Sequence, residues 1–135
     1  MNASHHERIV WSLERLSELH GDPTATIYAR LFAQYPELEA LFVLDRQGAV
    51  RGNMLANVFE ALFDMAGPRR YGLNAILAER VNHEGMGVAP EVFPIFFETV
   101  HATARDLLHA EWTPEIEAAW RGVLDEIYAA MNGAS

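Results

Sequence analysis

The sequence predicts an all-α protein of six or seven helices. Apolar residues recur three and four positions apart along most of the chain, which is the period of an α-helix. No segment shows the alternation of apolar and polar residues between hairpin turns that is typical of strands. Gly and Pro interrupt the helical pattern and mark the ends of its segments. The 135 residues, half of them hydrophobic, are expected to form one domain over residues 1–135 with a packed core.

Two helices are expected before residue 35. The first runs from about Glu7 to Leu19 and is followed by Gly21, which suits the left-handed conformation that ends many helices. Asp22-Pro23 then combines an N-cap residue with a proline of the first turn. This pair is expected to start a second helix that runs to Gln34.

A short turn and a long helix complete the first half of the chain. After Tyr35-Pro36 changes the chain direction, a helical turn is expected to end at Phe42. The polar segment 45–48 is expected to be a loop. The next helix begins near Val50 and carries one apolar stripe up to a break at Gly67-Pro68.

Three further helices are expected in the second half. Residues 71–83 form a helix with a weaker apolar face, and residues 90 to about 109 form the most aromatic helix. Trp112-Thr113-Pro114 is another N-cap and proline start. It opens a last helix that runs through Met131.

Composition excludes several classes of function. The formal net charge is −9, and all ten basic residues are Arg. This balance argues against binding to nucleic acid, which needs a clustered basic face, and against adhesion to an anionic membrane. The N-terminus lacks the pattern of a signal peptide, and the longest apolar region is too short to span a bilayer. We therefore expect a soluble, cytoplasmic protein.

The sequence contains no cysteine. This excludes disulfides, a thiolate nucleophile, zinc-finger sites and iron–sulfur clusters built from this chain. It also excludes covalent haem attachment through a Cys-x-x-Cys-His motif.

The most informative segment is His83-Glu84-Gly85-Met86-Gly87-Val88-Ala89-Pro90, between two of the expected helices. The histidine closes one amphipathic helix, the glycines break it, and Pro90 with Glu91 opens the next. This arrangement places one imidazole on a rigid corner at the mouth of an apolar helical pocket. An imidazole in that position can donate a lone pair to a metal or cofactor held in the pocket.

Four blocks of sequence occur in a specific order. They are Tyr28-x-x-Leu31-Phe32-x-x-Tyr35-Pro36-Glu37 continuing to Leu41-Phe42; Arg51 to Phe59 with Met54-Leu55 and Val58; His83 with Gly87, Val88, Pro90 and Glu91; and Trp112-Thr113-Pro114-Glu115 with Trp120. Each block alone is a weak signal. Together they resemble the globin domain of bacterial single-domain haemoglobins and flavohaemoglobins, over about residues 7–131. The resemblance implies a globin fold around a pocket for one non-covalent b-type haem.

The resemblance also implies roles for the matched residues. His83 matches the proximal histidine that ligates the haem iron, and Phe42 matches the phenylalanine that packs flat on the haem. Tyr28 matches the distal tyrosine that faces the gaseous ligand. A phenol donor in an apolar pocket stabilises O2, which carries partial negative charge when bound, over CO. Val88 and Phe93 are expected among the other residues that contact the cofactor.

Two departures from the flavohaemoglobin pattern have consequences. In that pattern a tyrosine of the next helix pairs with a late glutamate and polarises the proximal imidazole, but here Phe93 stands at the tyrosine position and the chain ends before the glutamate position. The polarisation of His83 is therefore expected to be weak. No flavin- or nicotinamide-binding domain follows, so electrons for sustained turnover would come from an external reductase.

The register of the distal helix has two alternatives. Aligning Met54-Leu55 with the family's apolar pair puts Val50 at the gate position and Met54 against the distal haem face. An ungapped count from Phe42 puts Gly52 at the gate instead. The first is favoured because it keeps Val50, Met54 and Val58 on one inward stripe. In neither register is there a distal histidine.

Other histidines and arginines have less specific expectations. His5 and His6 are expected in a solvated tail, and His101 as a partly buried, hydrogen-bonded residue. Three arginines are expected to be solvated, with one or two of them able to pair with haem propionates: Arg46, Arg51 and Arg80.

The function implied by the resemblance is reversible binding of O2 or another diatomic gas, NO or CO. The protein would then serve in oxygen delivery, in scavenging or in sensing, as a ligand-binding haemoprotein rather than an enzyme. One alternative is nitric-oxide dioxygenation with an external reductase. Another is a regulatory interaction module with a globin fold. The chain is expected to be a monomer or a homodimer.

Overall fold

The computed structural model describes residues 2–42, 45, 48–85 and 91–133. These residues form α-helices joined by short connections, with two 3₁₀ segments and no strand in the described parts of the chain. The predicted all-α class is confirmed. In chain order the elements are α1 (Asn2–His20), α2 (Thr24–Gln34), η1 (Pro36–Phe42), α3 (Ala49–Ala66), α4 (Gly72–Gly85), α5 (Val92–Leu108), η2 (His109–Glu111) and α6 (Pro114–Gly133).

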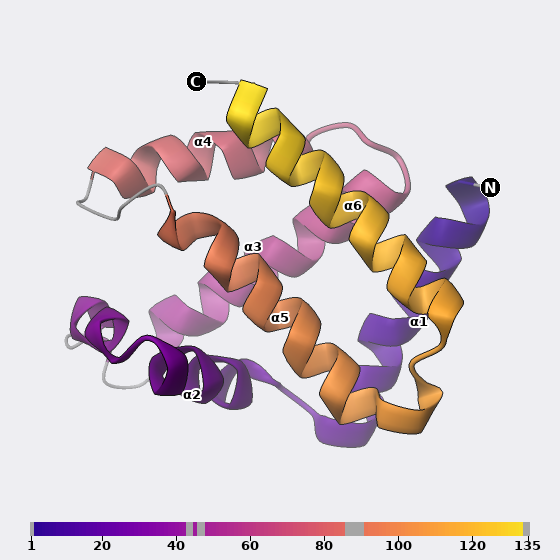
Figure 1. Cartoon of the computed structure of the whole chain (residues 1–135), viewed down its shortest axis with the longest axis horizontal. Helices are drawn as coiled ribbons and strands as arrows, with labels where there is room; N and C mark the ends of the chain where they lie inside the picture. Colours follow the sequence, from indigo (N-terminus) through magenta and orange to yellow (C-terminus); the bar gives the residue numbers. More distant parts are fainter. Residues whose placement is uncertain (1, 43–44, 46–47, 86–90, 134–135) are drawn as a thin grey trace.

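The helices cross one another around α5, which runs through the middle of the molecule (Figure 1). α1 packs against α3, α5 and α6, so the first and the last helix of the chain are neighbours. α2 packs on α5 and η1, while α4 packs on α3 and α6. The space between α2, α3, α4 and α5 is where the candidate site lies.

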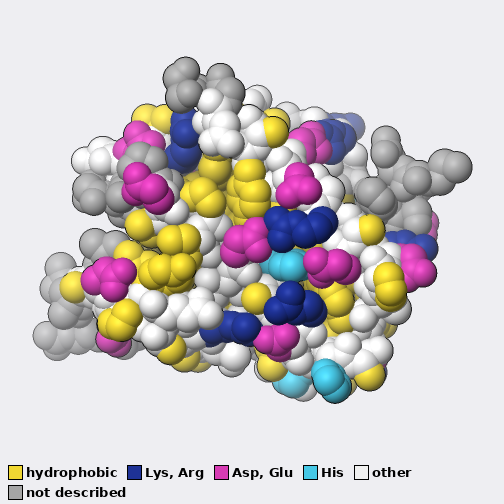
Figure 2. Space-filling model, viewed as in Figure 1, with side chains coloured by type: hydrophobic (Ala, Val, Ile, Leu, Met, Phe, Trp, Pro, Cys, Tyr) yellow, Lys and Arg dark blue, Asp and Glu magenta, His cyan; other side chains and the backbone are white. Residues whose placement is uncertain are grey.

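One face of the molecule, over α5 and α6, is strongly polar. Figure 2 shows Arg and acidic side chains interspersed around a histidine on this face.

A bilayer-spanning helix is absent from the described parts of the chain, since no helix there combines sufficient length with sufficient hydropathy.

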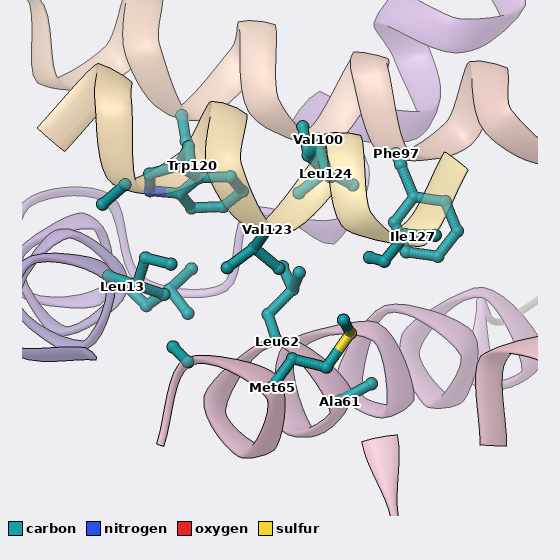
Figure 3. Packing of buried hydrophobic residues seen from close by; sticks show 14 of the residues in the cluster. Leu13, Ala61, Leu62, Met65, Phe97, Val100, Trp120, Val123, Leu124 and Ile127 are labelled. Atoms are coloured by element: carbon teal, nitrogen blue, oxygen red, sulfur yellow. The ribbon is translucent and has the colours of Figure 1, made fainter. Parts of the chain in front are cut away.

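The main core lies where α1, α3, α5 and α6 meet (Figure 3). Val123 of α6 points toward Leu62 of α3 there, while Leu124 lies on the opposite side of α6, beside Val100 of α5. Trp120 is fully buried, and its indole N–H donates a hydrogen bond to the Ser12 hydroxyl at 2.9 Å. The one polar atom of this large side chain is therefore satisfied inside the core.

A second, smaller apolar cluster lies apart from the main core. Its buried members are Tyr28, Leu31 and Leu38, from α2 and η1. Half-buried aromatic residues pack against it, and one of them, Phe96, also contacts the main core. The two clusters are thus bridged along α5 and do not merge into one packed core.

The helix ends at Gly21 and at Thr113 follow the local sequence signals, whereas α2 begins one residue later than expected, with Pro23 as its N-cap, and α4 continues past His83 to Gly85. Gly21 has φ +67°, and the Thr113 hydroxyl accepts the N–H of Ile116 at the start of α6. The expected start of the first helix near Glu7 was too late, since α1 begins at Asn2. His6 therefore lies on a helix. Its ring packs against Gly67, since a Cβ added to Gly67 would stand 2.6 Å from the His6 Nδ1. The prediction that His6 belongs to a solvated tail is wrong.

A buried carboxylate fixes the corner between α3 and α4. Asp64 accepts hydrogen bonds from the backbone N–H groups of Arg70, Tyr71 and Gly72, at 2.9, 3.0 and 2.6 Å. Burial disfavours the charged form of Asp64, but these three donors outweigh burial and hold its pKa below the ordinary value. The first turn of α4 is therefore tied to α3, which sets the direction in which α4 carries His83.

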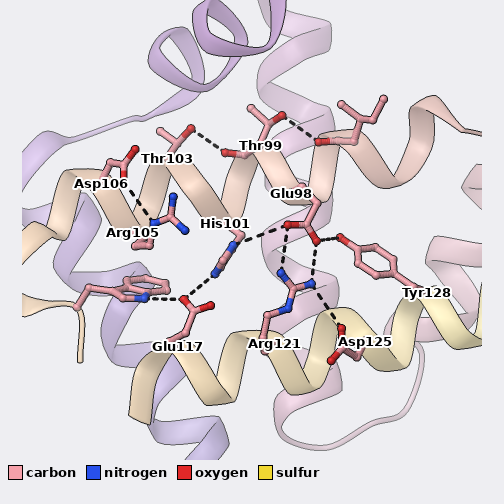
Figure 4. Close-up of polar contacts among 12 residues, drawn as sticks. Glu98, Thr99, His101, Thr103, Arg105, Asp106, Glu117, Arg121, Asp125 and Tyr128 are labelled. Atoms are coloured by element: carbon pink, nitrogen blue, oxygen red, sulfur yellow. Dashed lines mark hydrogen bonds and ion pairs between the residues drawn. The ribbon is translucent and has the colours of Figure 1, made fainter. Parts of the chain in front are cut away.

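The polar face over α5 and α6 is a connected hydrogen-bond network (Figure 4). Glu98 accepts hydrogen bonds from Arg121 at 2.8 Å and from the Tyr128 hydroxyl at 2.7 Å. His101 is buried beside it and is hydrogen-bonded to Glu117 at 2.9 Å. The prediction of a hydrogen-bonded His101 is confirmed, and the side chain is more fully buried than the partial burial expected.

Candidate functional site

A cavity of about 620 Å³ lies between α2, η1, α3, α4 and α5. Its size falls in the range of sites for small molecules and cofactors. Most of its walls are apolar, and five of the lining residues carry polar groups: Tyr28, Asp45, Asn57, Glu79 and His83. A mostly apolar cavity with a few polar groups is typical of a binding site.

The cavity brings together most of the residues singled out from the sequence. Six of them line it: Tyr28, Phe42, Val50, Met54, His83 and Phe93. They come from five different elements, so only the tertiary fold places them together. The seventh, Val88, lies outside the described residues.

Tyr28 lies in the middle of α2 and is almost completely buried. Its ring contacts those of Phe42 and Phe96, each with a centroid separation of 5.4 Å. The phenol oxygen is buried and has no hydrogen-bond partner among the described residues. Burial raises the pKa of the Tyr28 phenol above its ordinary value, so the hydroxyl keeps its proton at neutral pH. The cavity therefore contains a neutral donor that no described protein group satisfies.

His83 lies in the last turn of α4 and faces Phe93 of α5, with ring centroids 5.3 Å apart. Its Nδ1 is 2.7 Å from the backbone oxygen of Glu79. Because a carbonyl oxygen can only accept, Nδ1 carries the proton and Nε2 keeps a free lone pair. The imidazole is thus oriented by a backbone carbonyl, which agrees with the weak polarisation expected from Phe93 in place of a tyrosine. The Glu79 carboxylate is farther from Nδ1, at 3.8 Å.

One face of α3 forms the wall on the tyrosine side. Val50, Met54 and Val58 all line the cavity, as the inward stripe predicts. Gly52 is not among the lining residues, and a Cβ added to it would meet nothing within 4 Å. Val50 is 53% exposed, so it stands where the cavity meets solvent.

Several lining residues were missed by the sequence analysis. Asn57 continues the same helical stripe and could have been found by its spacing from Met54. Phe96 lies three residues beyond Phe93 and could have been found in the same way. Asp45 gave no such signal, because it belongs to a polar loop that reaches the cavity only through the tertiary fold.

The arginines near the site are paired with protein groups. Arg51 forms an ion pair with Asp45, with Nε 3.2 Å from Oδ2, and Arg80 donates to the backbone oxygen of Met131 at 3.0 Å. The prediction that these two side chains are simply solvated is wrong. Arg46 lies outside the described residues.

The described residues contain no cluster of three or more His, Asp or Glu side chains that could hold a metal ion by themselves. His83 therefore offers one nitrogen donor in an otherwise mostly apolar cavity. Such a donor set suits a metal whose other ligands belong to a cofactor.

Comparisons with known proteins agree with this geometry. The family model described as Globin matches residues 25–131. A flavohemoprotein of Rhizobium meliloti (strain 1021) is 31% identical over 111 residues, which is 78% of this chain and 27% of that protein. The chain therefore spans about a quarter of the length of this relative. No solved structure matches the chain significantly.

Proposed function

The chain belongs to the globin family and is a haem-binding globin, and we propose that its cavity holds one non-covalent b-type haem. His83 would hold the iron, and Tyr28 would donate a hydrogen bond to a gaseous ligand in the same cavity. Phe42, Val50, Met54 and Phe93 contact the cofactor. Val88, five residues after His83 in sequence, stays a sequence-based prediction, since it lies outside the described residues.

One observation carries this proposal: His83 and Tyr28, from different helices, line the same cavity with complementary polar groups. The hydrogen bond from His83 Nδ1 to the Glu79 backbone oxygen leaves the Nε2 lone pair for a metal. The buried Tyr28 hydroxyl has no hydrogen-bond partner among the described residues, and a bound ligand can supply one.

Haem iron, when bound, supplies an open coordination position for a diatomic gas. The chain's own residues supply the surroundings. Tyr28 donates a hydrogen bond to a ligand atom that carries partial negative charge. Phe42, Met54 and Val58 keep that region apolar, which strengthens the hydrogen bond and excludes water. The activity that fits these groups is reversible binding of O2 or another diatomic gas, for delivery, scavenging or sensing.

Haem titration of the purified chain tests this proposal. We expect a Soret band that saturates at one haem per chain, and reversible spectral changes when O2 or CO is added to the reduced protein. A chain that binds no haem, or whose bound haem responds to neither gas, would contradict the proposal.

A second candidate is the conversion of nitric oxide and O2 to nitrate, with one electron per turnover from an external reductase. The Tyr28 hydroxyl in the cavity and the similarity to a flavohemoprotein favour it. Phe93 in place of a tyrosine argues against it, because it leaves His83 without a side-chain acceptor from α5. Rapid, stoichiometric loss of nitric oxide in the presence of O2 and a defined reductase would support this activity.

A further inference from the structure

The start of α3 is held by a residue outside the helix. Gly48 precedes the helix with φ +78° and has no side chain that could cap it. The Asp45 carboxylate caps α3 instead, by accepting the backbone N–H groups of Val50 at 3.1 Å and of Arg51 at 3.0 Å. Asp45 thus fixes the helical turn that carries Val50 at the mouth of the cavity.

The same carboxylate is paired with the Arg51 side chain. Arg51 Nε lies 3.2 Å from Asp45 Oδ2, and Arg51 Nη2 donates to the Asp45 backbone oxygen at 2.7 Å. The Asp45 side chain is only 8% exposed and that of Arg51 27% exposed. The Arg30–Asp106 pair, by comparison, has exposures of 32% and 52%. Charges that are withdrawn from water are screened less and act more strongly on their surroundings.

Both charges act on the tyrosine side of the cavity. Asp45 itself lines the cavity together with Tyr28 and Val50. Burial is the main reason for the raised pKa of the Tyr28 phenol, while the charge of Arg51 opposes this rise and that of Asp45 adds to it. The two groups therefore exert opposite and partly cancelling influences at the phenol.

We propose that the Asp45–Arg51 ion pair is a positioning device for the tyrosine side of the pocket. Through its cap on α3 it holds Val50 at the mouth, and through its paired charges it sets the electric field felt by a ligand beside Tyr28. The inference rests on the proposed function, because that field is meaningful only for a ligand bound there. Asp45 and Arg51 act through position and charge, without bonding to the ligand.

The test compares two variants that remove one charge each. Asp45→Asn keeps an oxygen that can still cap α3 but leaves the Arg51 charge without its partner. Arg51→Gln leaves the Asp45 charge without its partner. Both are prepared as the full chain with haem. The readouts are the infrared C–O stretching frequency of the CO complex and the rate of O2 release from the reduced protein.

The two variants should move the readouts in opposite directions. Positive potential near the outer atom of the ligand stabilises negative charge there, which weakens the C–O bond and holds O2 more firmly. Asp45→Asn is therefore expected to lower the C–O frequency and slow O2 release, and Arg51→Gln to raise the frequency and speed release. Each rate should change by about two- to tenfold.

Asp106→Asn is the matched control. It makes the same chemical change in the ion pair between Asp106 and Arg30. Arg30 lies on α2, two residues from Tyr28, but neither Arg30 nor Asp106 lines the cavity. The control should leave the C–O frequency unchanged. Arg51→Lys, which keeps the charge, should return the frequency toward that of the wild type.

Frequency shifts in the same direction for both variants, or no shift in either, would overturn the inference. If the pair acted only as a structural cap, removing either charge would not shift the C–O frequency in opposite directions. If Asp45→Asn does not fold, Arg51→Gln and Arg51→Lys decide, and equal frequencies in these two would overturn it. A wild-type chain that binds neither haem nor CO would instead overturn the proposed function, and the inference with it.

Discussion

Tyr28 is the residue on which retention of O2 is expected to depend most directly. Its hydroxyl is buried, neutral and without a partner among the described residues. Tyr28→Phe removes this donor and keeps the ring that packs on Phe42 and Phe96. We expect a loss on the order of 1–3 kcal/mol, or about ten- to a hundredfold faster O2 release. CO release should change much less, since bound CO carries little charge.

Stopped-flow release of the two gases from wild type and Tyr28→Phe measures this difference. Phe32→Leu is a useful comparison, because it changes a ring beside Tyr28 but removes no donor. Equal O2 release rates in wild type and Tyr28→Phe would mean that the tyrosine only packs, or that another donor holds the ligand.

His83 should form an ordinary bond to iron. Its Nδ1 proton is engaged by the Glu79 backbone oxygen, and Phe93 offers no acceptor to the ring. A neutral carbonyl polarises the imidazole less than a carboxylate-linked acceptor does. The iron–histidine stretching frequency of the reduced protein, measured by resonance Raman spectroscopy, should therefore be unexceptional, and peroxidase-like turnover should be poor. An unusually high frequency would contradict this view of the site.

The sequence could place an individual residue in the pocket where that residue lies on a regular helix. Tyr28 and Met54 could be placed in the pocket because helical spacing fixes which face of the helix they occupy. The Asp45–Arg51 pair could not be predicted, because it depends on how an irregular segment folds back onto the first turn of α3. Local patterns do not encode such contacts.

The corner between α3 and α4 depends on one carboxylate. Asp64→Asn keeps the shape of the side chain but removes the charge that three backbone N–H groups bind. The variant should melt at a lower temperature than wild type at neutral pH, because charge-assisted hydrogen bonds are stronger than neutral ones. Asp125→Asn, on an exposed part of α6, serves as the control and should melt close to wild type.

The difference between wild type and Asp64→Asn should also depend on pH. The folded-state pKa of Asp64 is lowered from its ordinary value of 3.8, so the charged carboxylate stabilises the fold above that pH. As pH falls below 3.8 and through the lowered pKa, wild type loses this stabilisation and the variant has none to lose. The gap between the two melting temperatures should therefore narrow in acid. A gap that stays constant from neutral to strongly acidic pH would show that the charge is unimportant.

Element boundaries were predictable where a cap residue or a proline marks them. Thr113-Pro114 starts α6 as expected, with the Thr113 hydroxyl accepting the Ile116 N–H. The beginning of α1 was misplaced, since the residues before Glu7 carry no apolar stripe. A helix can extend beyond its apolar stripe when its neighbours continue the same backbone hydrogen bonds.

The stability of the whole molecule should depend on the main core. Leu124 is fully buried within it. Leu124→Ala should lower the free energy of unfolding by about 2–5 kcal/mol, because it removes buried apolar surface and leaves a cavity. Leu19→Ala, at an exposed position of α1, should have little effect. Chemical denaturation of the haem-free proteins measures both, so that stabilisation by a bound cofactor does not enter. Equal losses would contradict the assignment of the core.

The globin fold could be predicted from the order of four sequence blocks, because each matched block contributes residues to the cavity or the core. The division of the apolar residues into two clusters with the cavity beside them could not. Apolar spacing marks residues that face inward, but it does not say which of them fill the interior and which border an open space. That distinction arises from how the helices cross.

The most direct test of the account is the haem stoichiometry of His83→Ala, measured beside His20→Ala. His20 is an exposed histidine at the end of α1, hydrogen-bonded to the backbone oxygen of Leu107. His20→Ala should bind one haem per chain with the ferrous spectrum of wild type. His83→Ala should lose specific haem binding or keep only a weak, solvent-exposed complex, because no other described histidine lines the cavity. Full haem stoichiometry and an unaltered five-coordinate ferrous spectrum in His83→Ala would contradict the central claim that His83 ligates the iron.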